Sequence, residues 1–208
     1  MSNFKSALNS IHHKAVFGRR VEVLTMHFIN TIPAGAAKIL DLGSGSGTIA
    51  RRIMDLRPEL EITGVDILIR PNTLIPMIEY DGDTIPFADN HFDYVTIADV
   101  LHHTPNPAAV LKEAARVAKH GVIIKDHLVE GFLAEPILGF MDWVGNKGHN
   151  VRLIYNYYDR AQWDKAILDA GLKITHWDDD LKIYPMPFSL IFDGKLHFIA
   201  WFEKAGNQ

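Results

Sequence analysis

The chain has 208 residues, of which 48% are hydrophobic and 22% are charged, and this composition is typical of one globular domain. A formal net charge of −4 at pH 7 gives no basic excess for nucleic acid binding, and the absence of cysteine excludes disulfides and thiolate metal sites. No run of about 18 apolar residues predicts a membrane span, and the polar N-terminus lacks the apolar centre of a signal peptide. We therefore expect a cytoplasmic protein without nucleic acid or membrane partners.

Hydrophobic patterning predicts strands that alternate with helices along the chain. The expected strands are 38–42, 61–66, 77–80, 92–98, 121–126, 172–177 and 195–202. The expected helices are 19–32, 48–56, 106–118, 132–144 and 158–170. This alternation is typical of βαβ units in a mostly parallel sheet, where ligands bind beyond the carboxyl ends of the strands.

Chemically informative residues follow four of these strands. A glycine-rich turn begins at Gly43, Asp66 and Asp81 follow the next two strands, and Asp99 follows the fourth. Because parallel strands place their carboxyl ends at the same edge of a sheet, we expect these segments to converge on one ligand.

The glycine turn has the pattern Asp41-x-Gly43-x-Gly45-x-Gly47. Glycine permits a positive φ and close approach of a ligand, although a tight turn without a ligand is consistent with the same pattern. A dinucleotide fingerprint requires glycine at position 48, where this chain has Thr48. Asp41 would repel the pyrophosphate of a dinucleotide and attract an ammonium group, which favours a phosphate-free cofactor such as S-adenosylmethionine.

Asp66 lies about 20 residues beyond the glycine turn, at the end of the second strand. A carboxylate at this position accepts hydrogen bonds from both hydroxyls of a ribose. Since nicotinamide cofactors and S-adenosylmethionine both contain an adenosine ribose, Asp66 predicts an adenosine ligand without separating the two.

Four segments resemble motifs of class I S-adenosylmethionine-dependent methyltransferases, particularly the small-molecule group called methyltransferase type 11. Residues 39–47 are similar to the first motif of this family, and residues 64–66 are similar to its ribose-binding motif. Residues 81–93 are similar to the adenine loop and the strand after it, and residues 100–105 resemble the motif after the fourth strand. The resemblance covers Lys38 to about Lys125 and is less clear towards the C-terminus.

The resemblance implies a Rossmann-like α/β fold, with a doubly wound, mostly parallel seven-stranded sheet, an antiparallel C-terminal strand, helices on both faces and a small helical cap. It implies one domain over residues 1–208, with 1–35 as a helical lid and 127–158 as a substrate-cap insertion. The residues placed on S-adenosylmethionine are Asp41, Gly43, Ser44, Gly45, Gly47, Asp66, Ile67, Asp81, Gly82, Asp83, Ala98 and Asp99. Within this set, Asp81 or the nearby Asp83 would contact adenine, and Asp99 would lie near the methionine moiety.

Substrate recognition is expected from the long connection 127–158, which mixes aromatic and polar side chains as a pocket lining does. His127 follows the fifth strand, so it is the first candidate for a catalytic base, and His103 and His149 come next. The candidates to orient a polar group of a small-molecule substrate are Asp142, Asn146 and Tyr155. Alternatively, these histidines are structural, and the apolar side chains of 132–144 pack on the domain or form a homodimer interface.

The chain contains 11 histidines, which raises the question of a metal site. The pairs His12-His13 and His102-His103 place neighbouring side chains on different faces of a helix or strand, and no His-Glu-x-x-His spacing occurs. We therefore expect no metal site.

Three rival classes remain beside methyl transfer to a small molecule. A non-catalytic regulatory or scaffold protein that binds S-adenosylmethionine would keep the same cofactor residues. Asp41 and Thr48 disfavour a nicotinamide-dependent oxidoreductase, and the lack of a basic excess disfavours a macromolecular methyltransferase. Methyl transfer depends mainly on placing the acceptor in line with the sulfonium, so the family has no universal catalytic residue to search for.

Overall fold

The structure, a computed structural model, describes residues 18–146 and 154–206. The first described element is a helix over residues 18–31, and its apolar positions Leu24 and Phe28 are buried, as the helical spacing predicts. Within the described ranges, no helix combines the length and the apolar character that crossing a membrane requires.

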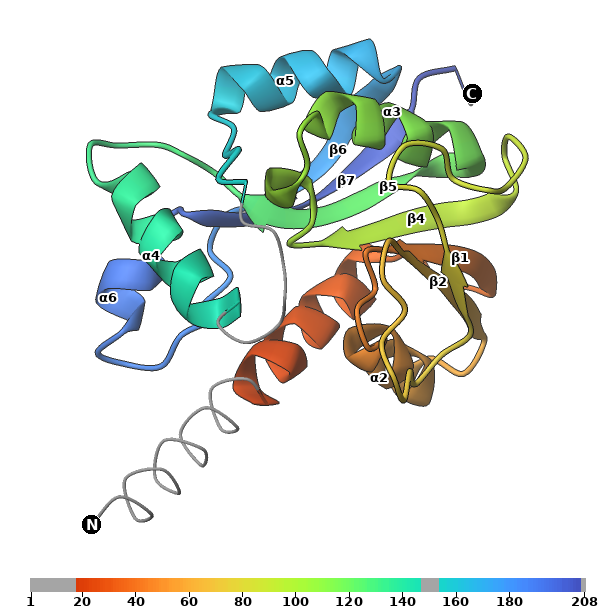
Figure 1. The fold of residues 1–208 in the computed structure, drawn as a ribbon, viewed down its shortest axis with the longest axis horizontal. Coiled ribbons are helices and arrows are strands. Elements are labelled where there is room, and N and C mark those ends of the chain that lie inside the picture. Colours follow the sequence, from red (N-terminus) through yellow and green to blue (C-terminus); the bar gives the residue numbers. More distant parts are fainter. Residues whose placement is uncertain (1–17, 147–153, 207–208) are drawn as a thin grey trace.

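Seven strands form one sheet in the order β3-β2-β1-β4-β5-β7-β6 (Figure 1). The strands are β1 (Ala37–Leu42), β2 (Leu60–Asp66), β3 (Met77–Glu79), β4 (Phe92–Ala98), β5 (Ala118–His127), β6 (Leu172–Asp178) and β7 (His197–Lys204). Strand β7 runs antiparallel to both β5 and β6, and the remaining pairs are parallel. The mostly parallel sheet with an antiparallel C-terminal strand confirms the predicted fold class.

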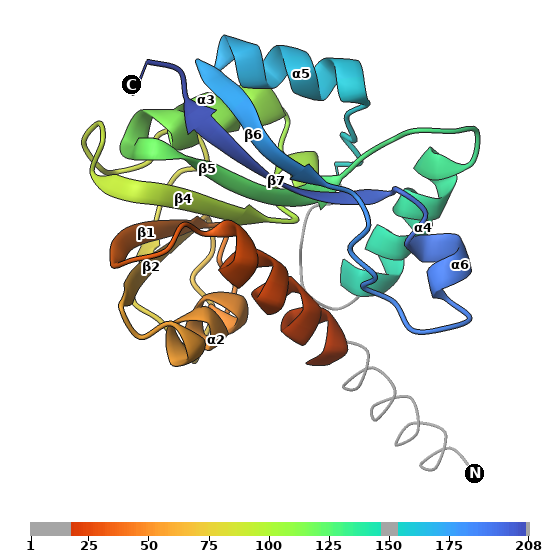
Figure 2. The same cartoon turned by 180° about the vertical axis from the view of Figure 1, so that it is seen from behind.

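Helices cover both faces of the sheet. Helices α3 (Pro107–Val117) and α5 (Arg160–Asp169) lie on one face, and α2 (Thr48–Leu56) lies with the helix of residues 18–31 on the other (Figures 1 and 2). Because both faces are covered, central strands are apolar in continuous runs, and Val122, Ile123 and Ile124 of β5 are fully buried.

A small cap lies beyond the carboxyl end of β5. Helix α4 (Ala134–Asn146) is the helix predicted within 132–144, and it lies beside α6 (Ser189–Phe192) in both views (Figures 1 and 2). Leu138 of α4 is buried against Leu196, whereas Phe140 and Trp143 remain half-exposed. These two aromatic side chains therefore do not pack into the core of the domain, and the cap contains a second helix that the sequence pattern did not predict.

Strand β5 begins at Ala118 rather than at 121, because Ala118 pairs with Phe92 of β4 across an irregularity in the register. The longer strand ends at His127, and its last three residues, Lys125, Asp126 and His127, are all buried. A strand that was predicted from its apolar centre therefore ends in three buried polar side chains, which contribute to the site described below.

Candidate functional site

The sheet order reverses at β1, which has β2 on one side and β4 on the other. In an open α/β sheet, ligands bind outside the carboxyl ends of the strands at such a switch point. Leu42 at the end of β1 pairs with Ile97 near the end of β4, so the glycine turn and Asp99 follow neighbouring strand ends. Two of the predicted ligand-binding segments are thus brought together.

The glycine turn adopts backbone angles that favour glycine. Gly43, Gly45 and Gly47 have φ of 70°, 60° and 75°. A Cβ atom on Gly43 would lie 2.4 Å from Cγ2 of Val100, and one on Gly47 would lie 2.6 Å from Cγ1 of Ile75. The turn from β1 into α2 therefore excludes larger side chains, and we call residues 43–47 the glycine cradle.

Asp41, the carboxylate before this cradle, is half-buried. Ser44 Oγ donates to one of its oxygens, and Thr96 Oγ1 donates to the other at 2.9 Å. Burial raises the pKa of Asp41 to about 6, since these two hydrogen bonds offset only part of the desolvation. A cationic group arriving beside Asp41 would relieve this cost, so the residue fits the ammonium of S-adenosylmethionine.

Asp66 contributes to the cradle from the end of β2. Its Oδ2 accepts from the backbone N–H of Gly45 at 2.8 Å, and its Oδ1 accepts from that of Leu68 at 3.2 Å. Each carboxylate oxygen has a second lone pair, so these bonds leave capacity for ribose hydroxyls. Asp66 thus holds the turn in place as well as having the position expected of a ribose ligand.

The loop after β3 carries the residues that were predicted to contact adenine. Asp81 Oδ1 accepts from the backbone N–H groups of Asp83 at 2.9 Å and Thr84 at 2.8 Å, which lowers the pKa of Asp81. Gly82 has φ of 89°, and a Cβ there would lie 3.3 Å from the side chain of Ile67. Ile67 is 62% exposed, so it offers an apolar surface beside this loop for a flat ring.

Asp99 follows β4 with φ of 56°, and its carboxylate forms ion pairs with Arg20 and Lys125. Burial alone would raise the pKa of Asp99, but the two cations hold it well below its usual range. Arg20 comes from the helix of residues 18–31 and Lys125 from β5. Asp99, which was expected near the methionine moiety, is therefore held by ion pairs with two basic side chains.

A second buried pair lies next to Asp99. In the 3₁₀ turn η1 (Leu101–His103), His102 Nδ1 donates to Asp126 Oδ1 at 2.5 Å, and its Nε2 lies 3.3 Å from Asp142 Oδ2. Burial would lower the pKa of His102, but the two carboxylates raise it to about 10. Tyr157 O–H also donates to Asp142, so α4 is tied to η1 and to the chain before α5.

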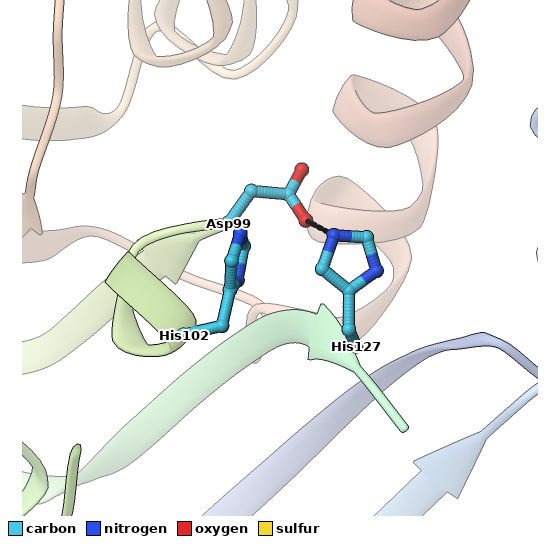
Figure 3. Close-up of side chains that lie close together, drawn as sticks. All are labelled: Asp99, His102 and His127. Carbon is cyan, nitrogen blue, oxygen red and sulfur yellow. Dashed lines mark ion pairs between the residues drawn. The ribbon is translucent and has the colours of Figure 1, made fainter. Parts of the chain in front are cut away.

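His127, the predicted base, lies in the same group. Its Nε2 is 3.7 Å from Asp99 Oδ1 (Figure 3). The same Nε2 is 3.6 Å from Asp142 Oδ1, and Nδ1 is buried without a hydrogen-bond partner. Burial, and then the charges of His102 and Lys125, lower the pKa of His127, so its imidazole is neutral at pH 7. We call the group formed by these buried and half-buried side chains the polar cluster; its members are Arg20, Asp99, His102, Lys125, Asp126, His127 and Asp142.

The other predicted substrate residues lie at different distances from the polar cluster. The ring of His103 is 4.0 Å from that of His102, and burial together with His102 lowers the pKa of His103 to about 4. Tyr155 is 46% exposed and stacks loosely near Tyr157, with ring centroids 6.2 Å apart. The side chain of Asn146 and the whole of His149 lie outside the described part of the chain.

Sequence reasoning missed several members of the polar cluster. It assigned Lys125 and Asp126 to an apolar strand, and it named the segment around Arg20 only as a cover for the cofactor. Arg20 and Asp99 are 79 residues apart in the chain, so no local pattern predicts that they meet. The one available signal was the Lys125-Asp126-His127 triplet at the end of an apolar strand.

A separate hollow of about 660 Å³ lies at the opposite edge of the sheet, near the end of the helix of residues 18–31. Ile32, Arg57 and Trp201 contribute to its lining. None of the predicted cofactor or substrate residues lines this hollow. The geometry therefore favours the carboxyl edge as the functional site.

Residues 40–124 match a protein family described as a methyltransferase domain. The ubiquinone/menaquinone biosynthesis C-methyltransferase UbiE of Cupriavidus necator is 32% identical to this chain over 96 residues. That match covers 40% of this chain and 40% of the relative, so the chain spans about two fifths of the length of this relative.

Two solved structures share the fold over most of the chain. The PH0226 protein from Pyrococcus horikoshii OT3 has a TM-score of 0.67 and 19% identity, and the match covers 90% of this chain and 91% of that one. An S-adenosylmethionine-dependent methyltransferase from Mesorhizobium loti has a TM-score of 0.59 and 16% identity, with 82% and 92% covered. At these identities the likeness shows the fold.

The sheet order and the glycine turn are those expected of the class I S-adenosylmethionine-dependent methyltransferase fold, and residues 40–124 match the methyltransferase domain family. The cofactor of this domain is S-adenosylmethionine, and the positive-φ glycine turn with the carboxylate of Asp41 beside it fits that molecule.

Proposed function

We propose that this protein transfers the methyl group of S-adenosylmethionine to a small-molecule acceptor, which binds beside the polar cluster. The observation that carries the proposal is the adjacency of two sites. The glycine cradle follows β1, whereas Asp99 and the polar cluster follow the neighbouring strands β4 and β5. A methyl donor in the first site would therefore face polar side chains in the second.

When bound, S-adenosylmethionine supplies a methyl group whose bond to sulfur breaks as an acceptor attacks in line, leaving S-adenosylhomocysteine. The chain has to hold both molecules and exclude water. Asp41 binds the ammonium group, Asp66 the ribose hydroxyls, and Asp81 or the backbone beside Gly82 the adenine. These assignments agree with the hydrogen-bonding capacity of each group.

On the acceptor side, His127 remains the proposed functional residue. It is 5% exposed and neutral at pH 7, so one of its ring nitrogens carries a free lone pair at the carboxyl end of β5. Such a lone pair accepts either a proton or a metal ion. Asp142 faces His127 at 3.6 Å and serves in the proposal as a partner that orients the ring.

The small-molecule class is supported by the name of the Cupriavidus necator relative, a C-methyltransferase of ubiquinone/menaquinone biosynthesis. The family match ends at residue 124, before His127 and the cap. The acceptor side therefore consists largely of residues outside the matched segment, and we propose an acceptor specificity of its own for this chain.

The test is a transfer assay with S-adenosylmethionine labelled in its methyl group and a panel of small oxygen, nitrogen, carbon and sulfur acceptors. We expect label to move to at least one small-molecule class. Binding of S-adenosylhomocysteine together with no transfer to any acceptor would contradict the enzymatic proposal and support a non-catalytic role.

A further inference from the structure

Four side chains of the polar cluster bring nitrogen or oxygen atoms close to one another. Asp99 follows β4, His102 lies in η1, His127 ends β5, and Asp142 comes from α4. One nitrogen or oxygen atom from each of Asp99, His102 and His127 lies within 4.8 Å of the others, and Figure 3 shows that these three side chains lie close together. His102, His103 and Asp142 form an overlapping group with the same spacing.

The spacing of these atoms matches that of a small metal ion. Zinc binds nitrogen and oxygen ligands at about 2.0–2.2 Å, so neighbouring ligand atoms of a tetrahedral site lie about 3.3–3.6 Å apart. Nε2 of His102 is 3.3 Å from Asp142 Oδ2, and Nε2 of His127 is 3.6 Å from Asp142 Oδ1. Nε2 of His127 is 3.7 Å from Asp99 Oδ1. These three separations are close to the ligand–ligand distances of such a site.

The surroundings of these ligands also resemble those of metal sites. A metal-binding histidine typically donates its other ring N–H to a carboxylate, and ligating carboxylates are themselves hydrogen-bonded. His102 donates from Nδ1 to Asp126, and its buried Nε2 has no hydrogen-bond partner. Tyr157 O–H donates to Asp142, and Lys125 donates to Asp99. His102, Asp142 and Asp99 thus each have a supporting group behind them, whereas the buried Nδ1 of His127 has no hydrogen-bond partner.

The charges of the polar cluster leave room for a cation. Three carboxylates, Asp99, Asp126 and Asp142, face two basic side chains, Arg20 and Lys125. Without a proton on His102 this set carries one negative charge more than positive, in a region where His102 is only 2% exposed. A buried excess of negative charge is costly, so either a proton on His102 or a metal ion in its place has to compensate it.

We propose that the group Asp99, His102 and His127 binds one divalent transition-metal ion, of which zinc is the best match, with Asp142 as a further carboxylate beside the two histidines. The inference rests on the proposed function, because the ion would lie on the acceptor side and bind an oxygen or nitrogen atom of the acceptor as an additional ligand. It also replaces the expectation of no metal site: the ligands come from four different elements, so their spacing along the chain contains no metal motif.

The alternative to a metal ion is a proton on His102. A protonated His102 between Asp126 and Asp142 would balance the charges without an ion. The two accounts differ in whether the stripped protein takes up metal with these residues as ligands.

The experiment uses the full-length chain without an affinity tag, stripped of metal with a chelator and titrated with Zn²⁺ alone and, separately, with Co²⁺ alone. We expect one equivalent of Zn²⁺ to bind, and we expect bound Co²⁺ to show the intense visible absorption of a tetrahedral site. Asp142→Asn, which keeps the side-chain volume, and His127→Ala should each weaken Zn²⁺ binding by at least about tenfold. The matched control is His176→Ala, which removes an exposed histidine of β6 and should leave the affinity unchanged.

Failure of the stripped wild-type protein to bind stoichiometric Zn²⁺ would overturn the inference in favour of the protonated cluster. Zn²⁺ binding that Asp142→Asn and His127→Ala leave unchanged would overturn it as well, because the ion would then lie elsewhere. Circular dichroism shows whether each variant is folded. If His127→Ala is unfolded, the Zn²⁺ affinity of Asp142→Asn alone decides the test. S-adenosylhomocysteine binding by the same stripped protein is measured separately, so failure of the cofactor site and failure of the metal site are distinguishable.

Discussion

His102 Nδ1 lies 2.5 Å from Asp126 Oδ1, and the two side chains are 2% and 0% exposed. The same carboxylate accepts from the backbone N–H groups of Leu101 at 3.0 Å and His127 at 2.7 Å. Asp126 therefore ties the turn after β4 to the end of β5. The relative positions of His102 and His127 therefore depend on the carboxylate of Asp126.

Replacing Asp126 by asparagine should destabilise the protein by about 3–5 kcal/mol, because a buried ion pair is broken and its partner remains in an apolar environment. Chemical denaturation of the metal-free protein measures the change. The control is Asp164→Asn, which breaks an exposed pair with Arg160 and should cost less than about 1 kcal/mol. Equal losses for the two variants would contradict the assigned importance of the buried pair.

Asp41 should make stability fall as pH rises between its unfolded and folded pKa values. Its ordinary pKa is 3.8, and burial raises this to about 6 in the folded protein without cofactor. Below pH 3.8 the group is protonated in both states. Between 3.8 and about 6 the unfolded chain ionises more readily, so the contribution of Asp41 to stability is lost progressively and is fully lost above about 6.

Asp41→Asn should remove this pH dependence. Relative to the variant, the wild-type free energy of unfolding should fall by at most about 3 kcal/mol across that window. Urea denaturation of both proteins at a series of pH values provides the comparison. If the free energies of unfolding of the two proteins changed with pH in parallel, the pKa of Asp41 would be the same in the folded and unfolded states, which would contradict the prediction.

The strands and the cofactor segment could be predicted from sequence because their signals are local. An apolar run followed by Asp41-x-Gly43-x-Gly45-x-Gly47 specifies a strand and a turn within a few residues, and the three glycines have the positive φ that the pattern implies. His127 and Asp142 were also named in advance, the first from its place after a strand and the second from the composition of the long connection.

The rest of the polar cluster could not be predicted in this way. Arg20 meets Asp99, and Lys125 meets Asp99 and His197, only after the sheet has brought separate segments together. Lys125 is 1% exposed, although lysine is rarely buried without a partner. The burial of Lys125 depends on its carboxylate partner, and the sequence does not show which carboxylate that is.

The glycine cradle should be intolerant of a single methyl group. Gly43→Ala would force a residue with φ of 70° to carry a Cβ against Val100, so we expect a loss of about 1–2 kcal/mol from backbone strain and loss of S-adenosylhomocysteine binding. Gly139→Ala is the matched control, because this glycine lies inside α4 with no atom within 4 Å of its Cβ position. Thermal unfolding and calorimetric titration check both effects. Unchanged cofactor binding in Gly43→Ala would contradict the assigned role of the cradle.

The role of Asp66 towards ribose can be separated from its role in the turn. Asp66→Ala should weaken S-adenosylhomocysteine binding, but it also removes the acceptor for the Gly45 N–H group. The 2′-deoxyribose analogue of S-adenosylhomocysteine resolves this: the wild type should bind it at least about tenfold more weakly, as expected when a charged acceptor loses its partner, whereas the variant should not distinguish the two ligands. A wild-type protein that binds both ligands equally would contradict the ribose assignment.

The most direct test of the methyl-donor site is calorimetric titration of the full-length wild-type chain with S-adenosylhomocysteine and, in parallel, with NADH. The cradle and Asp41 predict saturable binding of one S-adenosylhomocysteine per chain and no binding of NADH, whose pyrophosphate Asp41 repels. Absence of S-adenosylhomocysteine binding, or equal binding of NADH, would contradict the account.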